Sequence, residues 1–507
     1  MKNEQNLQNE NELLHQEVSE LKCEIEELKR QLSNLKKLTF GQKSEKTEYI
    51  ADGQLCLFNE AEQEENRKER DREKEIVVPE HKRKAKRTHE ELLKELPVEE
   101  VVHESEEVCD KCGSETKQVG KEFVRDELVY IPASLFVRKH YSAVYKCTQC
   151  GKSETETDIE SQHFVKAICP QPMIPHSFCS PELLAHIAYE KYALGTPLHR
   201  QAGDLSAKGV CISTATLANW IIYASKAWLK PLYDEMKEDL LCHEVIHADE
   251  TVVQVLREQG KKPKSESRMW VYCAGEIGCK DNILFEYQPT RNGDHAKSFL
   301  GDFAGHLVTD GFSGYDKLTG MTHHGCWAHL RRKFVEALPT DKELAKDSSS
   351  ARAIEYIDRL FKIERECETD ADRQKKRNSE SRKIIEEFYE WLGGINPVGT
   401  GLPAAVGYAM TQKKKLTAYL DSPNVPMSNN RAENAIRPFC IGRKNWLFST
   451  SVKGAEASAV FYSLAATAKA NDLPIEEYFT MLFKTLPNAK GNKEVLTSLL
   501  PFNVDKK

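Results

Sequence analysis

Leucine recurs at every seventh position over the first 40 residues, from Leu7 to Leu35. The positions between these leucines are held by Asn11, Val18, Ile25 and Leu32. Leucine at heptad position d with mainly β-branched residues at position a favours a parallel two-stranded coiled coil, and one asparagine at a sets its register. We therefore predict a leucine zipper over residues 1–40 that makes the chain a homodimer or a higher oligomer.

Within the predicted linker 41–103, residues 60–95 are almost entirely charged and have no apolar period. They are interpreted as a linker, either a solvated tether or an extended helix. Residues 81–87 form a basic cluster within it. This cluster is either a contact for phosphate groups or, equally well, an ordinary solvated run of charge.

Two CxxC pairs, each followed by a glycine, enclose a segment of strand-forming residues. Their four cysteines are Cys109, Cys112, Cys147 and Cys150. Four thiolates close a tetrahedral Zn²⁺ site and leave no open position for catalysis. We predict a structural zinc ribbon over residues 104–165, which binds either DNA or protein.

Helical periodicity marks residues 170–241. Two central segments have the proportions of a helix-turn-helix, with Gly209 in the turn and Ser213 capping the second helix. On that interpretation this is a DNA-binding region, and an ordinary helical bundle explains the pattern equally well. The candidate DNA contacts are Thr214, Thr216, Asn219 and Lys226.

From Glu244 the period changes from helix to strand, in the segments EVIHADE, TVVQVL, RMWVYCAG and NILFEY. A helix, the strand HLVTD and the helix WAHLRRKFVEAL follow. This order is that of a ribonuclease H-like α/β core. In such a core the first and fourth strands lie side by side, so Asp249 and Asp310 are expected to meet at one edge of the sheet.

Neighbouring buried carboxylates repel one another and need a cation to remain ionised, and oxygen ligands select Mg²⁺ or Mn²⁺. Two such ions assist phosphodiester displacement by activating the attacking oxygen and stabilising the leaving one. A third carboxylate is expected on a helix that faces this edge. Glu433 is the best candidate, with Ser428 or Asn429 as the helix cap. A lone aspartate at a strand end is more often structural, so this prediction depends on the strand order.

Four segments carry a resemblance to a known family: HADET (247–251), TDGFSGY (309–315), GCWAHLRRKF (325–334) and NNRAENAIRPFCIGRKNWLF (429–448). Together with the zipper, the LTFGQKSEK segment after it and the CxxC pairs, they resemble the insertion-sequence-sixty-six transposases of bacteria. The resemblance covers nearly the whole chain and implies a DDE catalytic triad of Asp249, Asp310 and Glu433. The family usually has an arginine after the glutamate, where this chain has Asn434.

The predicted fold is a multidomain α/β chain in which the ribonuclease H-like core is interrupted by helices. The first part of the core spans residues 242–338, and an all-helical insertion, which the family also has, spans 339–415. The final core helix with Glu433 lies in residues 416–470, and residues 471–507 are interpreted as a C-terminal tail.

Basic side chains follow the second aspartate and the glutamate, as a DNA backbone requires. The predicted DNA contacts are Arg331, Arg332, Lys333, Arg437, Arg443 and Lys444. Cys326 and His329 form a CxxH pair whose expected use is packing and hydrogen bonding, with metal binding left open. Trp446 is interpreted as a core residue rather than a stacking platform for a base.

The net charge of −7 means that any DNA binding depends on local basic patches. No window approaches 18 uninterrupted apolar residues and the polar N-terminus resembles no signal peptide, which excludes a membrane protein and indicates the cytoplasm. The resemblance implies an active transposase that binds double-stranded DNA at the element ends and at the target, in some members with small accessory proteins. A catalytically silent DNA-binding regulator is the alternative. The sequence does not distinguish a transposase from a nuclease that lacks strand transfer.

Overall fold

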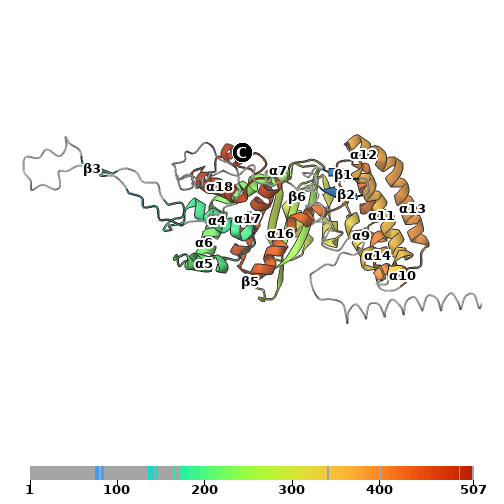
Figure 1. Cartoon of the computed structure of the whole chain (residues 1–507), viewed down its shortest axis with the longest axis horizontal. Coiled ribbons are helices and arrows are strands. Elements are labelled where there is room, and N and C mark those ends of the chain that lie inside the picture. The colour runs from blue at the N-terminus through green and yellow to red at the C-terminus, as the bar shows by residue number, and fades with distance from the viewer. Residues whose placement is uncertain are drawn as a thin grey trace, which may run out of the picture. The chain divides into compact units, whose positions relative to one another are not determined.

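The computed structural model describes residues 75–78, 81–84, 135–141, 144–146, 164–166, 172–339, 342–398, 401–489 and 491–504 (Figure 1). The chain divides into two compact units, one of residues 58–169 and the other of residues 1–57 with 170–507. The predicted zipper and the four zinc-binding cysteines lie outside the described residues.

The described part of the smaller unit consists of two short antiparallel strand pairs. Strand β1 (Glu75–Val78) pairs with β2 (His81–Lys84), and β3 (Val144–Lys146) pairs with β4 (Phe164–Lys166). The interpretation of residues 41–103 as a tether or an extended helix is therefore wrong for this hairpin. Three consecutive β-branched residues, Ile76 to Val78, favour the extended backbone of β1.

A six-stranded sheet forms the centre of the larger unit, with strand order β7-β6-β5-β8-β9 and β10 paired to β5. The strands are β5 (Val245–Arg257), β6 (Glu266–Ala274), β7 (Ile283–Gln288), β8 (His306–Val308), β9 (Thr322–His324) and β10 (Ser449–Ser451). Strand β6 is antiparallel to both β5 and β7, whereas β8, β9 and β10 run parallel to β5.

Two sequence predictions about this sheet can be compared with it. The expected pairing of the first strand with the strand before Asp310 is confirmed, because His247 lies opposite Val308 in β5 and β8. The prediction of two separate strands, EVIHADE and TVVQVL, is wrong, since both belong to the 13-residue strand β5. No turn residue interrupts the two segments, so the strand continues through them.

Helices cover both faces of the sheet. Tyr272 of β6 stacks on Phe299 of α8 (Gly293–Leu300), with ring centroids 3.8 Å apart. Phe285 of β7 points to the opposite face and packs against Phe439 of α16 (Asn430–Trp446). On the same side, α17 (Val452–Ala470) closes the β7 edge, because the Ser463 and Thr467 hydroxyls accept hydrogen bonds from backbone N–H groups of β7.

The helical region before the sheet contains α4 (Pro181–Tyr192), α5 (Leu198–Ala207), α6 (Thr214–Ala224), a π-helical turn (Ser225–Leu229) and α7 (Lys230–Leu240). The predicted turn and cap are confirmed: Gly209 has a φ of +89°, and the Ser213 hydroxyl accepts a hydrogen bond from Thr216 N. Helix α6 buries Leu217 and Trp220 in the core that it shares with the sheet.

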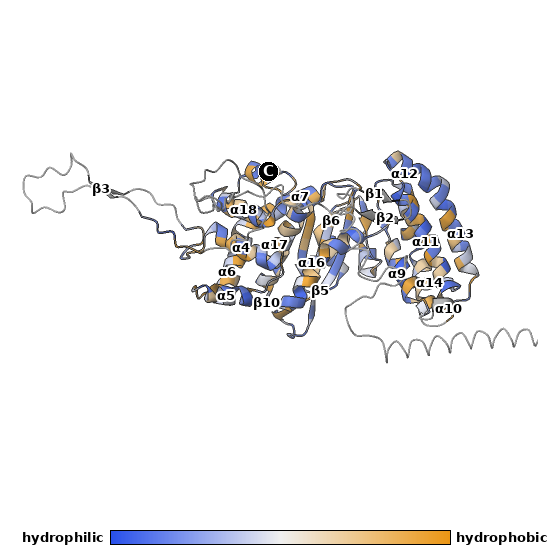
Figure 2. Ribbon diagram, viewed as in Figure 1, coloured by the Kyte–Doolittle hydropathy of each residue, from blue (hydrophilic) through white to orange (hydrophobic). Residues whose placement is uncertain are grey.

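The predicted all-helical insertion is confirmed over its described residues. After α9 (Trp327–Glu336) it contains α10 (Lys342–Lys346), α11 (Ser349–Arg365), α12 (Asp370–Lys376), a π-helical turn (Arg377–Ser381), α13 (Arg382–Gly394), α14 (Gly401–Thr411), α15 (Lys413–Thr417) and a 3-10 turn (Ala418–Asp421). Figure 2 shows hydrophilic and hydrophobic residues along α11 and α13. Their apolar faces form a second hydrophobic core with α9.

The C-terminal segment 471–507 is not a tail, contrary to the sequence prediction. It forms α18 (Ile475–Ala489) and α19 (Lys493–Ser498), and α18 packs on α4. Apolar residues at helical spacing bury one face of α18, including Phe479, Leu482 and Phe483. Ion pairs of His186 with Glu476 and of Lys484 with Glu182 join the two helices at the surface.

Candidate active site

Asp249 and Asp310 lie at equivalent positions on two neighbouring strands. Asp249 lies two residues after His247 in β5, and Asp310 lies two residues after Val308, the last residue of β8. His247 and Val308 face each other across the two strands. Asp249 Oδ1 accepts a hydrogen bond of 2.8 Å from Glu250 N, and Asp310 Oδ1 accepts one of 2.9 Å from Phe312 N. Because the two strands are parallel, both side chains reach the same edge of the sheet.

Glu433 lies in the first turn of α16, and buried Asn429 ties the start of this helix to β5. The Asn429 amide donates to Ala248 O at 2.9 Å and accepts from His247 Nδ1 at 3.0 Å. Asn429 therefore attaches the helix that carries Glu433 to the two residues that precede Asp249.

The three predicted carboxylates are close enough to act on one another electrostatically. Burial, followed by the charges of Glu250, Asp310 and Glu433, raises the pKa of Asp249 well above its ordinary value. Mutual repulsion of this kind occurs when several carboxylates share one site. Asp310 and Glu433 lie 61 and 184 residues after Asp249 in the sequence, and the folded structure brings them near it.

A fourth carboxylate, Glu250, lies beside the three and was missed by the sequence interpretation. Its side chain is almost fully buried, accepts from the Tyr315 hydroxyl at 2.8 Å and pairs with Arg291 at 2.6 Å. Burial and the charge of Asp310 raise the pKa of Glu250 in spite of these partners. Two features of the sequence could have identified Glu250 as a site residue. It lies next to Asp249 in HADET, and TDGFSGY contains the tyrosine that contacts it.

Both carboxylate oxygens of Glu433 face basic side chains of α9. Oε2 accepts from Arg332 at 2.8 Å, and Oε1 lies 3.1 Å from His329 Nδ1. Burial acts to raise the pKa of Glu433, but these two partners outweigh it and hold that pKa below its ordinary value. The pKa values of Glu433 and Asp249 are therefore shifted in opposite directions, Glu433 by its basic partners and Asp249 by burial and like charges.

Cys326 caps α9 and connects it to α16. Its Sγ accepts hydrogen bonds from His329 N at 3.4 Å and from Asn429 N at 3.1 Å. Cys326, His329 and Glu433 also have ligand atoms close enough to hold a metal ion. The sulfur is already occupied by two backbone donors, which agrees with the predicted use of the CxxH pair in packing and hydrogen bonding.

Three of the predicted DNA contacts are engaged by the protein itself. Arg331 is buried and forms a two-bond ion pair with Asp358 of α11, and Arg332 pairs with Glu433. Arg443 donates to Thr251 Oγ1 at 3.0 Å and to Val252 O on β5. Their guanidinium groups satisfy acceptors inside the fold, and contact of these three residues with DNA stays a prediction.

The other predicted contacts differ in their exposure. Lys333 places its ammonium 4.9 Å from the ring centre of Tyr408, and Arg437 is half-buried. Lys444, Thr214, Asn219 and Lys226 are exposed, and Thr216 is half-buried with its hydroxyl 2.8 Å from that of Ser213. Trp446 packs edge-on against Phe439, as predicted for a core residue.

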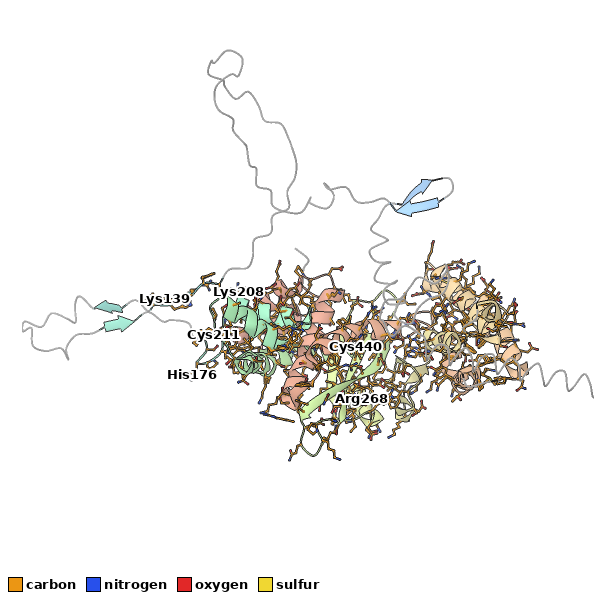
Figure 3. All side chains as sticks on the ribbon, turned by 60° about the horizontal axis from the view of Figure 1, so that its bottom comes forward. Lys139, His176, Lys208, Cys211, Arg268 and Cys440 are labelled. Atoms are coloured by element: carbon orange, nitrogen blue, oxygen red, sulfur yellow. The ribbon has the colours of Figure 1, made fainter. Side chains whose placement is uncertain are left out.

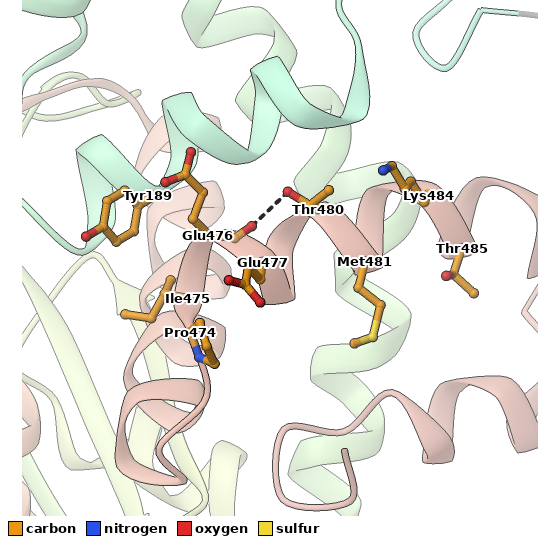
Figure 4. A pocket seen from close by; sticks show the side chains of 9 residues that line it. All are labelled: Tyr189, Pro474, Ile475, Glu476, Glu477, Thr480, Met481, Lys484 and Thr485. Atoms are coloured by element: carbon orange, nitrogen blue, oxygen red, sulfur yellow. Dashed lines mark hydrogen bonds between the residues drawn. The ribbon is translucent and has the colours of Figure 1, made fainter. Parts of the chain in front are cut away.

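A groove of about 690 Å³ lies away from these carboxylates. Tyr189 of α4 and residues from Pro474 to Thr485 line it, as Figure 4 shows. None of its lining residues belongs to the strands or helices that carry Asp249, Asp310 or Glu433. Within the described residues, no helix is long and apolar enough to cross a membrane.

Comparisons with known proteins agree with this architecture. The model of the family described as "Transposase IS66 family" matches residues 176–457. This match covers more than half of the chain and includes all three carboxylates. The zinc-finger binding domain of transposase IS66 matches residues 106–151, and the Transposase C of IS166 homeodomain matches residues 27–101. The first of these two matches contains all four cysteines of the predicted zinc ribbon and supports a structural zinc site.

Two relatives from Sinorhizobium fredii extend the similarity. The uncharacterized protein y4hP is 26% identical over 400 residues, covering 74% of this chain and 70% of its own length. The uncharacterized protein y4jD is 26% identical over 433 residues and covers 81% of each chain. With the family match across the sheet and its flanking helices, the chain belongs to the IS66 family of transposases.

Proposed function

We propose that this transposase cleaves and joins DNA strands by a DDE mechanism in which Asp249, Asp310 and Glu433 are the catalytic carboxylates. The observation that carries the proposal is the meeting of these three side chains from β5, the end of β8 and α16 at one edge of the sheet. The strand order, with three antiparallel strands followed by two parallel ones, supports a ribonuclease H-like fold.

The donor set fits hard divalent cations. Three carboxylates supply oxygen ligands of the kind that Mg²⁺ or Mn²⁺ prefers, and their mutual repulsion is relieved by positive charge. Glu433 Oε1 is buried without a hydrogen-bond partner, although it lies near His329. When bound at these residues, two such ions supply Lewis-acid activation of the attacking oxygen and charge stabilisation of the leaving oxygen.

The surrounding side chains hold the carboxylates in place. Arg332 and His329 fix Glu433 from α9. The Tyr408 hydroxyl of α14 donates to Asp310 O at 2.6 Å, so the insertion fixes the loop that carries the second aspartate. Pre-positioning of this kind lowers the cost of aligning the reacting groups.

In the proposed reaction, water attacks the phosphodiester at the element end and the P–O3′ bond breaks. The released 3′-hydroxyl then attacks a phosphodiester of the target DNA, and a new P–O bond to the element forms as the P–O3′ bond of the target breaks and leaves a free 3′-hydroxyl on the target strand. The zinc ribbon and the α5–α6 pair bind the terminal repeats, with Thr214, Thr216 and Asn219 as the α6 contacts. The zipper pairs two protomers so that both ends are processed together, and accessory proteins of the element assist where they are needed.

The first test is Mg²⁺-dependent cleavage of duplex DNA carrying the element's own ends, for the wild type and Glu433→Gln. We expect Glu433→Gln to lose cleavage and to retain DNA binding measured by electrophoretic mobility shift. Binding without cleavage by both proteins, also after addition of the element's other products, would indicate the alternative function of a DNA-binding regulator. Cleavage without strand transfer by the wild type would indicate a nuclease.

A further inference from the structure

Strand β5 continues for eight residues beyond Asp249, to Arg257, where a second element joins it. Strand β10, directly after α16, pairs in parallel with this end: Ser449 faces Val255 and Ser451 faces Arg257. Ser451 also caps α17 by accepting from Gly454 N at 3.2 Å. The far end of β5, the end of α16 and the start of α17 therefore meet around β10.

Exposed cations gather at this meeting point. Arg257, Lys262, Lys264 and Lys453 are exposed and form no ion pair with any described residue, and Lys444 is exposed on the last turn of α16. Two of the nearby carboxylates are neutralised, Glu258 by Lys261 at 2.9 Å and Glu266 by Arg268, which is labelled in Figure 3. In a chain with a net charge of −7, Arg257, Lys262, Lys264 and Lys453 thus place positive charge at this edge that no ion pair with a described residue offsets, beside the exposed carboxylate of Glu456 on α17.

Two apolar side chains stand exposed among these cations. Leu447, between α16 and β10, is 62% exposed and has a φ of +64°, and Phe448 is 40% exposed. A leucine in the left-handed region is strained, and glycine is the usual residue at such a helix end. Hydrogen bonds from Leu447 N to Arg443 O and from Phe448 N to Trp446 O hold the turn in this conformation.

The spacing along regular elements measures how far this edge lies from the carboxylates. From Glu433 to Leu447, α16 advances about 21 Å at its usual rise per residue. From Asp249 to Arg257, β5 advances about 26 Å. In B-form DNA these lengths correspond to about six to eight base pairs.

We propose that this distal edge is a second contact surface for duplex DNA, about six to eight base pairs from the phosphate that is cleaved. Arg257, Lys444 and Lys453 bind the DNA backbone, and Leu447 and Phe448 press on a base step and unstack it. The inference rests on the proposed function, because the distance is counted from the proposed catalytic carboxylates. Duplex DNA is the occupant that matches both the positive charge and the exposed apolar side chains.

The charge component is tested with the full chain and a 40-base-pair duplex carrying one element end. The triple variant Arg257→Gln, Lys444→Gln, Lys453→Gln is compared with the control Lys297→Gln, Lys375→Gln, Lys383→Gln, which removes the same charge from exposed positions on α8, α12 and α13. We expect the slope of log affinity against log salt to fall by about 0.9 for each lost phosphate contact, in the first variant only. Equal slopes for the two triple variants would contradict the proposal.

The apolar component is tested with 2-aminopurine placed in turn at each of base pairs four to ten from the cleavage point. We expect fluorescence to rise on binding of the wild type at positions six to eight and to stay low with Leu447→Gly and with Phe448→Ala. Glycine relieves the strain at residue 447, so the thermal unfolding midpoint of Leu447→Gly is expected to be unchanged or higher. Loss of the signal in a fully stable variant separates DNA contact from folding.

The outcomes distinguish this inference from the function on which it rests. Wild-type binding and cleavage with no effect of either set of substitutions would contradict the distal contact alone. Absence of any DNA binding by the wild type would contradict the proposed function and the distal contact together. A change of oligomeric state in light scattering, with DNA affinity unchanged, would assign the edge to a second copy of the chain instead.

Discussion

The amide of Asn429 donates a hydrogen bond of 2.9 Å to the carbonyl oxygen of Ala248, the residue directly before Asp249. This bond joins the helix that carries Glu433 to the strand that carries the first aspartate, across 181 residues of sequence. Asn429 is therefore one of the side chains that set the spacing between these two proposed catalytic carboxylates, together with Arg443, which joins the same helix to Thr251 of the strand. Four predictions follow from contacts of this kind.

Replacing Asn429 by alanine is expected to lower both stability and cleavage. The substitution leaves Ala248 O and His247 Nδ1 without their partner, which costs about 1–3 kcal/mol of unfolding free energy. It also releases the start of α16, so the cleavage rate is expected to fall about tenfold or more at temperatures where the variant remains folded. Asn378→Ala, at an exposed position of the insertion, is the control. A stability loss with normal cleavage would show that Asn429 has no positioning role.

Arg331→Met is expected to affect folding rather than DNA binding. Arg331 is buried and holds Asp358 through two hydrogen bonds of 2.7 and 3.2 Å. Loss of this pair is expected to cost about 1–3 kcal/mol, which urea unfolding measures. The salt dependence of DNA binding should equal that of the wild type. A smaller slope would restore Arg331 as a contact for the DNA backbone.

Tyr408→Phe tests whether the insertion positions the second aspartate. The change removes the hydrogen bond to Asp310 O and is expected to slow cleavage several-fold, with a stability loss of about 0.5–1.5 kcal/mol. Tyr389→Phe is the matched control, because its hydroxyl donates to Ala409 O within the same insertion and does not contact Asp310. Equal cleavage rates for the two variants would contradict the positioning role.

His243 is expected to make stability depend on pH. The neighbouring carboxylates of Asp239, at 3.6 Å, and Glu276, at 2.9 Å, raise the pKa of His243 from 6.5 to about 9. Because the pKa is higher in the folded state, the stabilisation is fully present below about pH 6.5 and is lost as the pH rises through about 9. His243→Gln should therefore be less stable than the wild type at pH 6, by at most about 3 kcal/mol, and the difference should shrink by pH 10. A difference independent of pH in urea unfolding would refute this.

Local patterns in the sequence predicted much of the fold. Apolar periodicity located the helices from α4 to α7 and the strands β5 to β9, although it divided β5 into two, and Ser213 and Gly209 identified a cap and a turn that the structure contains. These signals depend only on residues close together in the chain, which is why they can be recognised without a partner. The same periodicity was present in α18, and its neglect led to the wrong assignment of a tail.

The polar contacts around the site were not predictable in this way. Arg331 and Arg332 are adjacent in sequence, yet one pairs with Asp358 on α11 and the other with Glu433 on α16. Glu250 likewise takes Arg291 and Tyr315 as partners from later elements. The sequence around a charged residue does not show toward which neighbouring element its helix or strand will point the side chain.

The sequence alone predicted most of the helices and strands from α4 to α16, and it identified Asp249, Asp310 and Glu433 as candidates through motifs that resemble a family. Only the tertiary structure decided which basic side chains pair with the protein's own carboxylates and which remain exposed on the surface. The physical reason is that hydrogen bonds and ion pairs act over a few ångströms. Their partners can lie far apart along the chain, as do Thr251 and Arg443 at a separation of 192 residues, and they meet only when the sheet and helices have packed.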